Sequence, residues 1–455
     1  MSELKSPRDT PFRINLEQQK KRAKELLKAF RCAEHSALSR FIQHHPKYTN
    51  YKEHLSSSEA GHAQPGDAQL SDAQFVIARE FGLANWAQLK KHITSMTQAS
   101  SAIKEKASPP DAALKTLHIR CGTDLQHTLP AGGFNGDFLE YSDPYGQGPI
   151  LLNDNFINTR AKFLHEAYDP LFENELDDKL NDKRSDKTLD STRTYLETAH
   201  DKLKQAAQQY KRVVFWLEHD GYDQLILAKL LSFYAQNKMP EKLEMICINH
   251  FPGSARFIGL GQLPPEAIRL LWQQRQAVNP QQLKLGDRIW NSLGESSPQS
   301  LNKIIKSKDI KYLPNMEAAL RRHLQELPST GNGLSLTEQL SLEMLNEESM
   351  TAGQMFKRLV SERDPLPWLG DIMYWFILQS MMQASKPVFE ISRSDLNKPW
   401  HERLLTITDT GKKVLAGKRQ WLSLNPPDRW LGGIKLCARH PCWRWDDKEM
   451  QPVLI

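Results

Sequence analysis

Three residues close together in the chain have side chains suited to acid–base chemistry. His219 and Asp220 are adjacent, and Asp223 follows three residues later. An imidazole beside carboxylates can be held near neutral pH as a general base, or it can share a metal ion with them. We therefore predict that His219, Asp220 and Asp223 are catalytic. Asp220 could equally cap a helix that begins near Gln224, so a structural role for two of the three stays open.

A second set of polar residues follows an apolar, strand-like run at 116–121. Gly122 would let the backbone turn tightly, and Thr123 and Asp124 come directly after it. A helix that begins near Asp124 would offer unpaired N–H groups to a phosphate or carboxylate. Gly122, Thr123 and Asp124 are therefore predicted to bind an anionic ligand. Alternatively, Asp124 is the N-cap of this helix and occupies the same N–H groups itself.

Further candidates for ligand binding lie later in the chain. Asp143 follows the second strand-like run, and Gln224 follows the third. Arg321 and Arg322 share one predicted helix, where they either reach an anionic ligand or remain ordinary exposed cations. A divalent metal such as Mg²⁺ or Mn²⁺ would prefer an oxygen-rich set of ligands. The first choices in this chain are Asp124, Asp143, His219 and Asp223.

The phosphate-binding motifs of common nucleotide enzymes are absent from the sequence. It contains neither G-x-G-x-x-G nor G-x-x-x-x-G-K-[ST]. The glycines at 132, 133 and 136 precede the second strand-like run, which is the wrong edge of a sheet for a phosphate loop. These observations argue against a standard dinucleotide or P-loop enzyme, and they leave the cofactor unknown.

The predicted secondary structure explains how the polar residues could meet. Strand-like runs occur at 116–121, 137–141, 212–217 and 243–248, and helical patterns at 125–129 and 224–235 lie between members of the set. Alternating strands and helices indicate a parallel sheet. In such a sheet, ligands bind beyond the carboxyl ends of the strands, near the switch in strand order. The sequence therefore predicts an α/β fold built on a Rossmann-like parallel sheet.

The pattern along the chain predicts a helical part on each side of this sheet domain. Residues 1–97 have the spacing of a helical module, and 98–115 have the composition of a linker. The Rossmann-like domain covers 116–255, with a helical insertion at 156–210 that could cover the sheet as a lid. A helical connector at 256–330 then leads to a winged-helix-like α+β domain at 331–455, which ends in a hairpin that turns at 439–441.

The winged-helix prediction raises the question of nucleic-acid binding. It depends on three helical runs at 335–345, 351–362 and 369–384, followed by a strand pair at 387–392 and 403–408. A DNA-reading helix presents polar and basic side chains to base edges. Here the third helix has Asp371 as its sole charged residue, so packing or dimerisation is the favoured interpretation. Nucleic acid remains a disfavoured partner.

Composition and charge restrict the classes of protein to which this chain can belong. The chain has 455 residues and a net charge of +6, and residues 1–47 hold 11 Lys and Arg against 5 Asp and Glu, so this segment alone carries that excess. Its helices are candidates for contact with a protein partner. No apolar run approaches the ~18 residues of a membrane span, so we expect a cytoplasmic protein with no membrane contact. Five cysteines, an odd number, indicate reduced thiols.

Several motifs between residue 116 and the end carry a resemblance to a known family. They are His118-Ile-Arg-Cys-Gly-Thr-Asp, Asp143-Pro-Tyr-Gly-Gln-Gly-Pro, Trp216-Leu-Glu-His-Asp-Gly-Tyr-Asp-Gln-Leu, Gly259-Leu-Gly-Gln-Leu, Leu320-Arg-Arg-His-Leu, Gly333-Leu-Ser-Leu-Thr-Glu, Trp368-Leu-Gly-Asp and Arg429-Trp-Leu-Gly-Gly. By these motifs, about three quarters of the chain resembles the uncharacterised bacterial family called domain of unknown function 1835, with its usual C-terminal companion domain. That family carries no established activity, so the resemblance implies no reaction.

The N-terminal fifth resembles a different protein module. A helical run at 71–81, the stop at Gly82 and a second helix opened by Asn85-Trp86 are similar to the helical module that precedes ankyrin repeats. This resemblance implies packing or contact with a partner, and no chemistry.

Three hypotheses about function follow from the sequence. The first is a small phosphorylated or nucleotide ligand bound at the carboxyl edge of the sheet, with hydrolytic or phosphoryl-transfer chemistry as an option. The second is a regulatory or nucleic-acid-associated protein in which the sheet domain senses and the winged helix responds. The third is a non-catalytic interaction scaffold, and a sheet edge whose polar residues are all hydrogen-bonded caps would favour it.

Overall fold

The computed structural model describes residues 12–49, 65–173, 188–254, 256–438 and 441–455. These divide into two compact units. The first comprises the described parts of 1–113 together with 124–135 and 248–275, and the second comprises 114–123, 136–247 and 276–455. The boundaries predicted between a helical module, a sheet domain, a connector and a winged helix stay predictions.

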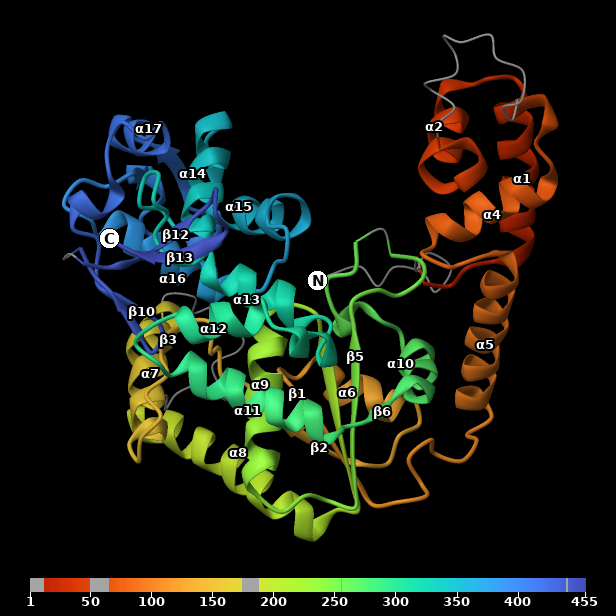
Figure 1. Ribbon diagram of the computed structural model, residues 1–455, viewed down its shortest axis with the longest axis horizontal. Helices are drawn as coiled ribbons and strands as arrows, with labels where there is room; N and C mark the ends of the chain where they lie inside the picture. The colour runs from red at the N-terminus through yellow and green to blue at the C-terminus, as the bar shows by residue number, and fades with distance from the viewer. Residues whose placement is uncertain (1–11, 50–64, 174–187, 255, 439–440) are drawn as a thin grey trace. The chain divides into compact units, whose positions relative to one another are not determined.

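The first unit is helical. Its helices are α1 (Leu16–Arg31), α2 (His35–His44), α4 (Leu70–Glu80), α5 (Trp86–Lys104), α6 (Asp124–Ala131) and α10 (Pro265–Leu271) (Figure 1). Two helical pairs were predicted in this segment, and both form. Asn15 and Asn85 cap α1 and α5 by accepting a backbone N–H, and Phe30 stacks on Phe41 in a small core of their own.

The second unit is built on a five-stranded sheet in the order β2-β1-β4-β5-β6. The strands are β1 (Thr116–Arg120), β2 (Asp137–Glu140), β4 (Arg212–Glu218), β5 (Lys242–Ile248) and β6 (Gln276–Ala277). β1 runs parallel to both β2 and β4, whereas β6 is antiparallel to β5. The four predicted strands therefore form within one residue of their predicted ends, in a mixed α/β fold with a mostly parallel sheet.

The order of this sheet creates a switch point between β1 and β4. The chain goes from β1 to its neighbour β2 and returns to the other side of β1 as β4. Every residue of β4 is buried, which suits its apolar and β-branched sequence. Polar residues that follow β1 and β4 are thereby brought to adjacent positions at one edge.

Helices pack around the sheet of the second unit. α7 (Phe156–Glu173) and α8 (Leu189–Gln209) pack against each other, and α9 (Gly221–Gln236) packs along α11 (Pro280–Leu293) (Figure 1). The insertion predicted at 156–210 is therefore a helical pair, although its residues 174–187 lie outside the described part of the chain. α12 (Gln299–Ile305) and α13 (Met316–Leu324) continue the helical segment that was predicted as a connector.

The C-terminal elements lie close to where the sequence predicted them. Helices α14 (Leu336–Glu347), α15 (Ala352–Arg358) and α16 (Asp371–Met382) precede β8 (Phe389–Ile391), β9 (Leu404–Ile407) and α17 (Asp409–Leu415). A further strand, β7 (Met350–Thr351), joins a sheet of order β7-β9-β8. Helix α16 is buried through residues that include Tyr374, Trp375 and Leu378, so its apolar sequence is explained by packing.

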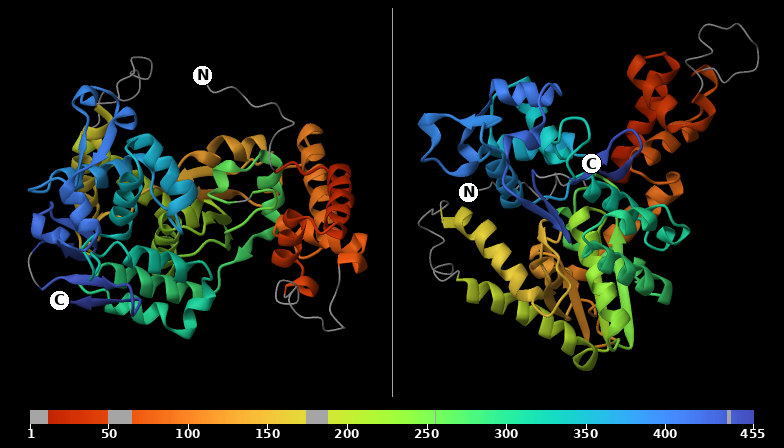
Figure 2. Two further views of the ribbon diagram at one scale, coloured as in Figure 1. Left: turned by 90° about the horizontal axis from the view of Figure 1, so that it is seen from above. Right: turned by 60° about the vertical axis from the view of Figure 1, so that its left-hand side comes forward.

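The predicted terminal hairpin differs from the structure. The prediction paired 430–437 with 442–445 through a turn at 439–441, of which 439–440 lie outside the described residues. Instead, β10 (Arg429–Gly432) pairs with β11 (Ile434–Leu436), and β12 (Trp443–Asp446) pairs with β13 (Gln451–Leu454) (Figure 2). Gly432, whose φ is +59°, allows the early reversal. β10 also pairs in parallel with β3 (Gly148–Pro149).

Candidate functional site

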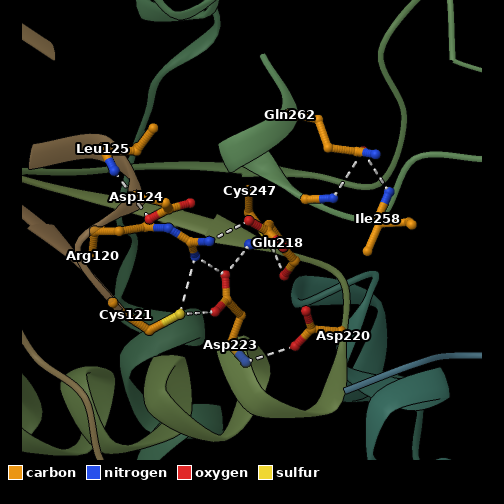
Figure 3. A network of polar contacts seen from close by, with 12 residues as sticks. Arg120, Cys121, Asp124, Leu125, Glu218, Asp220, Asp223, Cys247, Ile258 and Gln262 are labelled. Carbon is orange, nitrogen blue, oxygen red and sulfur yellow. Dashed lines mark hydrogen bonds and ion pairs between the residues drawn. The ribbon is translucent and has the colours of Figure 1, made fainter. Parts of the chain in front are cut away.

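A buried cluster of charged residues lies where β1 and β4 end (Figure 3). The guanidinium of Arg120 donates to the carboxylates of Glu218 and Asp223. Asp223 also accepts the backbone N–H of Glu218 at 2.6 Å. All three side chains are at most 6% exposed. We call Arg120, Cys121, Glu218, Asp220 and Asp223 the sheet-edge cluster.

Two cysteines belong to or border this cluster, and neither is set up as a nucleophile. The thiol of Cys121 donates to Asp223, and burial together with the charge of that carboxylate raises its pKa well above the usual value, against the opposing charge of Arg120. Cys247 accepts from Gln224 Nε2 at 3.3 Å and from Asn315 Nδ2 at 3.4 Å, and burial raises the pKa of this thiol too. All five cysteines are free, as the odd number indicated.

Asp220 has the structural role that the sequence left open. Its side chain caps α9 by accepting the backbone N–H of Asp223 at 2.9 Å. Burial and the negative charge of Asp223 raise the pKa of Asp220 to about 8. Asp223 is equally committed, because both of its oxygens accept hydrogen bonds within the cluster. The two predicted catalytic carboxylates are therefore held by internal partners.

The other residues predicted at this edge are Gly122, Thr123, Asp124, His219 and Gln224, which follow β1 and β4. Gly122 does turn the backbone, with a φ of +74°, and its N–H donates to Ser142 Oγ at 2.6 Å. Gln224 donates to the backbone oxygen of Glu218, and His219 is half-buried. Thr123 is exposed beside Gly122, whereas Asp124 begins α6 and belongs to the first unit.

The four side chains named as first choices for a divalent metal, Asp124, Asp143, His219 and Asp223, are not gathered into one site. Within the residues that the structure describes, no group of three or more His, Cys, Asp or Glu side chains is arranged to hold a metal ion. The physical reason is that two of the predicted ligands are already paired with cations. Asp223 is paired with Arg120, and Asp143 is paired with Arg160.

Arg321 and Arg322 also have protein partners. Arg322 is buried and donates to Asp364, Glu326 and Thr337. Burial alone would lower the pKa of Arg322, but the charges of Glu326 and Asp364 outweigh it and raise the pKa. Arg321 is a third exposed and pairs with Glu317 at 3.2 Å. The prediction that Arg322 contacts a ligand is therefore replaced by a structural role.

A large cavity lies elsewhere in the second unit, at the carboxyl end of β2. Its volume is about 600 Å³, within the range of small-molecule pockets, about 300–1,000 Å³. Its walls come from the loop after β2, the first turns of α7, the middle of α8, the second half of α9 and the end of α11. We call it the α8–α9 cavity.

A fixed ion pair forms one wall of this cavity. Asp143, predicted from its position after the second strand, accepts from Arg160 Nε at 3.0 and 3.1 Å. Arg160 is completely buried and also donates to the backbone oxygen of Gln147 at 2.7 Å. Because each charge is neutralised by the other, this pair gives the wall shape and polarity without net charge.

Lys229, on α9, also lines the cavity. Its ammonium nitrogen lies 4.8 Å from the ring centre of Trp290 and 5.1 Å from that of Phe156. Among the described residues, none forms an ion pair or hydrogen bond with this nitrogen. Burial lowers the pKa of Lys229 to about 8, although the charge of Asp143 opposes the shift.

Two further basic residues on α8 line the cavity. Burial lowers the pKa of His200 to about 4, with help from the charges of Lys229 and Lys204, so its imidazole is neutral at pH 7. Lys204 is exposed and lies 3.5 Å from Asp201. The first turn of α7 contains no acidic residue, and Asn153, Ile157 and Asn158 line the cavity there.

Sequence reasoning missed the residues that matter most in this arrangement. Arg120 and Arg160 were not singled out, because their importance depends on partners that only the folded chain supplies. Lys229 did leave a signal, since it is the sole charged residue between Gln224 and Ala235 in an otherwise apolar helix. Such a residue needs either a buried partner or a cavity.

Comparisons with known proteins add no assignment. No family model, curated protein or solved structure matches this chain. Among the described helices, none is both long and apolar enough to cross a membrane.

Proposed function

We propose that this chain binds a small anionic ligand, a phosphorylated metabolite or nucleotide, in the α8–α9 cavity. The observation that carries the proposal is an ammonium group, that of Lys229, at the wall of a cavity of about 600 Å³ with no carboxylate paired to it among the described residues. A buried cation without a protein counter-ion is costly, and a ligand anion would offset that cost.

The surroundings of the cavity fit such a ligand. Lys204, which pairs with the exposed Asp201 at 3.5 Å, also lines the cavity, and so does the first turn of α7, which contains no acidic residue. The rings of Tyr145, Phe156 and Trp290 offer apolar faces against which a base or sugar ring can pack. The negative charges of Asp154 and Glu197 lie on exposed side chains, where water screens them.

This proposal moves the site away from the residues predicted first. The sheet-edge cluster is filled by its own hydrogen bonds, whereas the α8–α9 cavity is open. The cavity extends from the loop after β2 along α7, α8, α9 and α11. We propose that the sheet is Rossmann-like and that 331–455 form a winged-helix-like domain. We also propose that the chain is related to the family called domain of unknown function 1835.

A thermal-shift panel of nucleotides and phosphosugars tests the proposed function. A ligand at a hundred times its Kd stabilises the folded state by about 2.7 kcal/mol, so binding raises the melting temperature. We expect at least one compound to shift the wild type and to lose its effect in Asn291→Trp, which places a large ring at the exposed rim of the cavity. Gln281→Trp, an exposed position on the same helix outside the cavity, is the matched control.

The panel has a clear negative outcome. If no compound shifts the wild type, or if a compound shifts Asn291→Trp as strongly as Gln281→Trp, the α8–α9 cavity is not the binding site.

A further inference from the structure

We propose that the ligand of the α8–α9 cavity carries an aldehyde or ketone, and that Lys229 condenses with it to form an imine. This inference rests on the proposed function and deepens it, because it names the reactive group of the ligand and the side chain that meets it.

The position of Lys229 meets the geometric needs of a nucleophilic amine. Its nitrogen lies at the wall of a cavity large enough for a small metabolite, 4.8 Å from the centre of Trp290. An amine that donates to a carboxylate is held protonated by that partner and is a poor nucleophile. No described residue holds Lys229 in this way, so its nitrogen is available to a ligand.

The charged groups around Lys229 act in opposite directions. Asp143 stabilises the ammonium form, but its own charge is shared with Arg160. From α8, Lys204 adds like charge to the cavity and Glu197 adds an exposed carboxylate, and Asp154 lies at the start of α7. The faces of Phe156 and Trp290 also favour the ammonium form. Burial outweighs the charge of Asp143 and lowers the pKa of Lys229.

The net result is an amine that is partly neutral at physiological pH. With a pKa of about 8, about one amine in ten is neutral at pH 7, compared with about one in three thousand for an ordinary lysine. Desolvation of a lysine in an apolar pocket is a recognised route to a nucleophilic amine.

The reaction balances without any further reagent. The neutral nitrogen of Lys229 adds to the carbonyl carbon, and the carbonyl oxygen takes up the proton that this nitrogen loses, which gives a carbinolamine. Loss of that oxygen as water leaves a carbon–nitrogen double bond. One amine and one carbonyl thus give one imine and one water. The first turn of α7 and Lys204 would hold the phosphate of the same ligand.

Pyridoxal 5′-phosphate is a suitable probe, because it combines an aldehyde with a phosphate. The full chain is incubated with a substoichiometric amount, the imine is reduced with borohydride, and the modified lysine is located by peptide mass spectrometry. We expect Lys229 to be labelled at least about tenfold faster than Lys202, an exposed lysine on α8 outside the cavity. The labelling rate of Lys229 should level off above about pH 8, whereas that of Lys202 should keep rising.

Two variants test whether labelling is specific to Lys229 or is shared by exposed lysines. Lys229→Arg keeps a cation over the two rings and should lose the label, while Lys202→Met should leave labelling of Lys229 unchanged. Circular dichroism and the melting temperature establish that both variants fold. The pH profile of the wild type is informative even if Lys229→Arg does not fold.

The opposite result is equally definite. Label spread over exposed lysines, with Lys229 no faster than Lys202, overturns the imine proposal. Glycerol 3-phosphate, which has a phosphate and no carbonyl, and AMP then decide the fate of the proposed function. If either stabilises the wild type and not Asn291→Trp, the anion site stands without the imine. If neither these two nor any other compound of the panel does so, both proposals fail together.

Discussion

Arg120 forms a buried ion pair with Asp223 across the switch point of the sheet, although 103 positions separate them in the chain. The same guanidinium also holds Glu218. One cation thus pairs with two carboxylates at the position where a ligand would otherwise bind in a sheet of this topology. The edge between β1 and β4 is therefore closed by the protein itself, and the open space lies next to β2.

Removal of the central cation should destabilise the second unit strongly. Arg120→Met leaves Glu218 and Asp223 buried without a counter-charge, which costs about 3–5 kcal/mol. The free energy of unfolding, measured by urea titration, should fall by that amount at pH 8.

An exposed ion pair provides the matched comparison. Arg288 pairs with Asp309 at 2.8 Å, and both side chains are more than two fifths exposed. Arg288→Met should therefore change the free energy of unfolding by no more than about 1 kcal/mol. Equal effects of the two substitutions would contradict the buried network around Arg120.

Two adjacent arginines should behave differently for the same reason. Arg322→Met strands Asp364 and Glu326 in the interior and should cost about 3–5 kcal/mol. Arg321→Met removes a partly exposed contact with Glu317 and should cost about 1 kcal/mol or less. Urea titration of both variants checks this, and the thermal-shift panel should give the same ligand preferences for Arg321→Met as for the wild type. Loss of ligand binding in Arg321→Met would instead support the prediction that Arg321 contacts the ligand.

The raised pKa of Asp220 predicts a pH dependence of stability. The folded-state pKa of about 8 lies above the usual value of 3.8, so the folded chain binds this proton more tightly than the unfolded chain. The stability that this group contributes is present below about pH 4 and is lost as the pH rises to about 8. Asp220→Asn keeps a good helix cap and removes the charge, so it should lack this loss and be more stable than the wild type at pH 8.5.

A second variant at this position distinguishes the charge from the cap. Asp220→Ala removes the bond to the Asp223 N–H and should cost about 0.5–2 kcal/mol even at pH 4. Melting temperatures of the three proteins between pH 4 and 9 provide the comparison. Parallel curves for the wild type and Asp220→Asn would show that Asp220 does not titrate in this interval.

Much of the secondary structure could be predicted because it depends on local pattern. Four strands form within one residue of their predicted ends, since runs such as Val213–Leu217 are apolar and rich in β-branched or aromatic residues. The C-terminal pairing could not be predicted in the same way. A Gly432-Gly433 turn reverses the chain earlier than the pattern indicated, and strand partners depend on tertiary packing.

The site was harder to predict, because one residue type fits two roles. Asp220 and Asp223 were correctly placed together at a sheet edge, but a carboxylate that caps a helix and one that abstracts a proton look alike in a sequence. What separates them is a partner such as Arg120, which lies on another strand. The α8–α9 cavity depends on how four helices pack, and only the lone charge of Lys229 in an apolar helix hinted at it.

The most direct test of the central claim is hydrogen–deuterium exchange of the wild type with and without the compound that raises its melting temperature most. A ligand in the α8–α9 cavity should slow exchange in peptides covering 153–160, 196–204 and 229–237, which form its walls. Protection confined to 219–224, or to the helical segment 16–44, with no change in the cavity walls, would contradict the account.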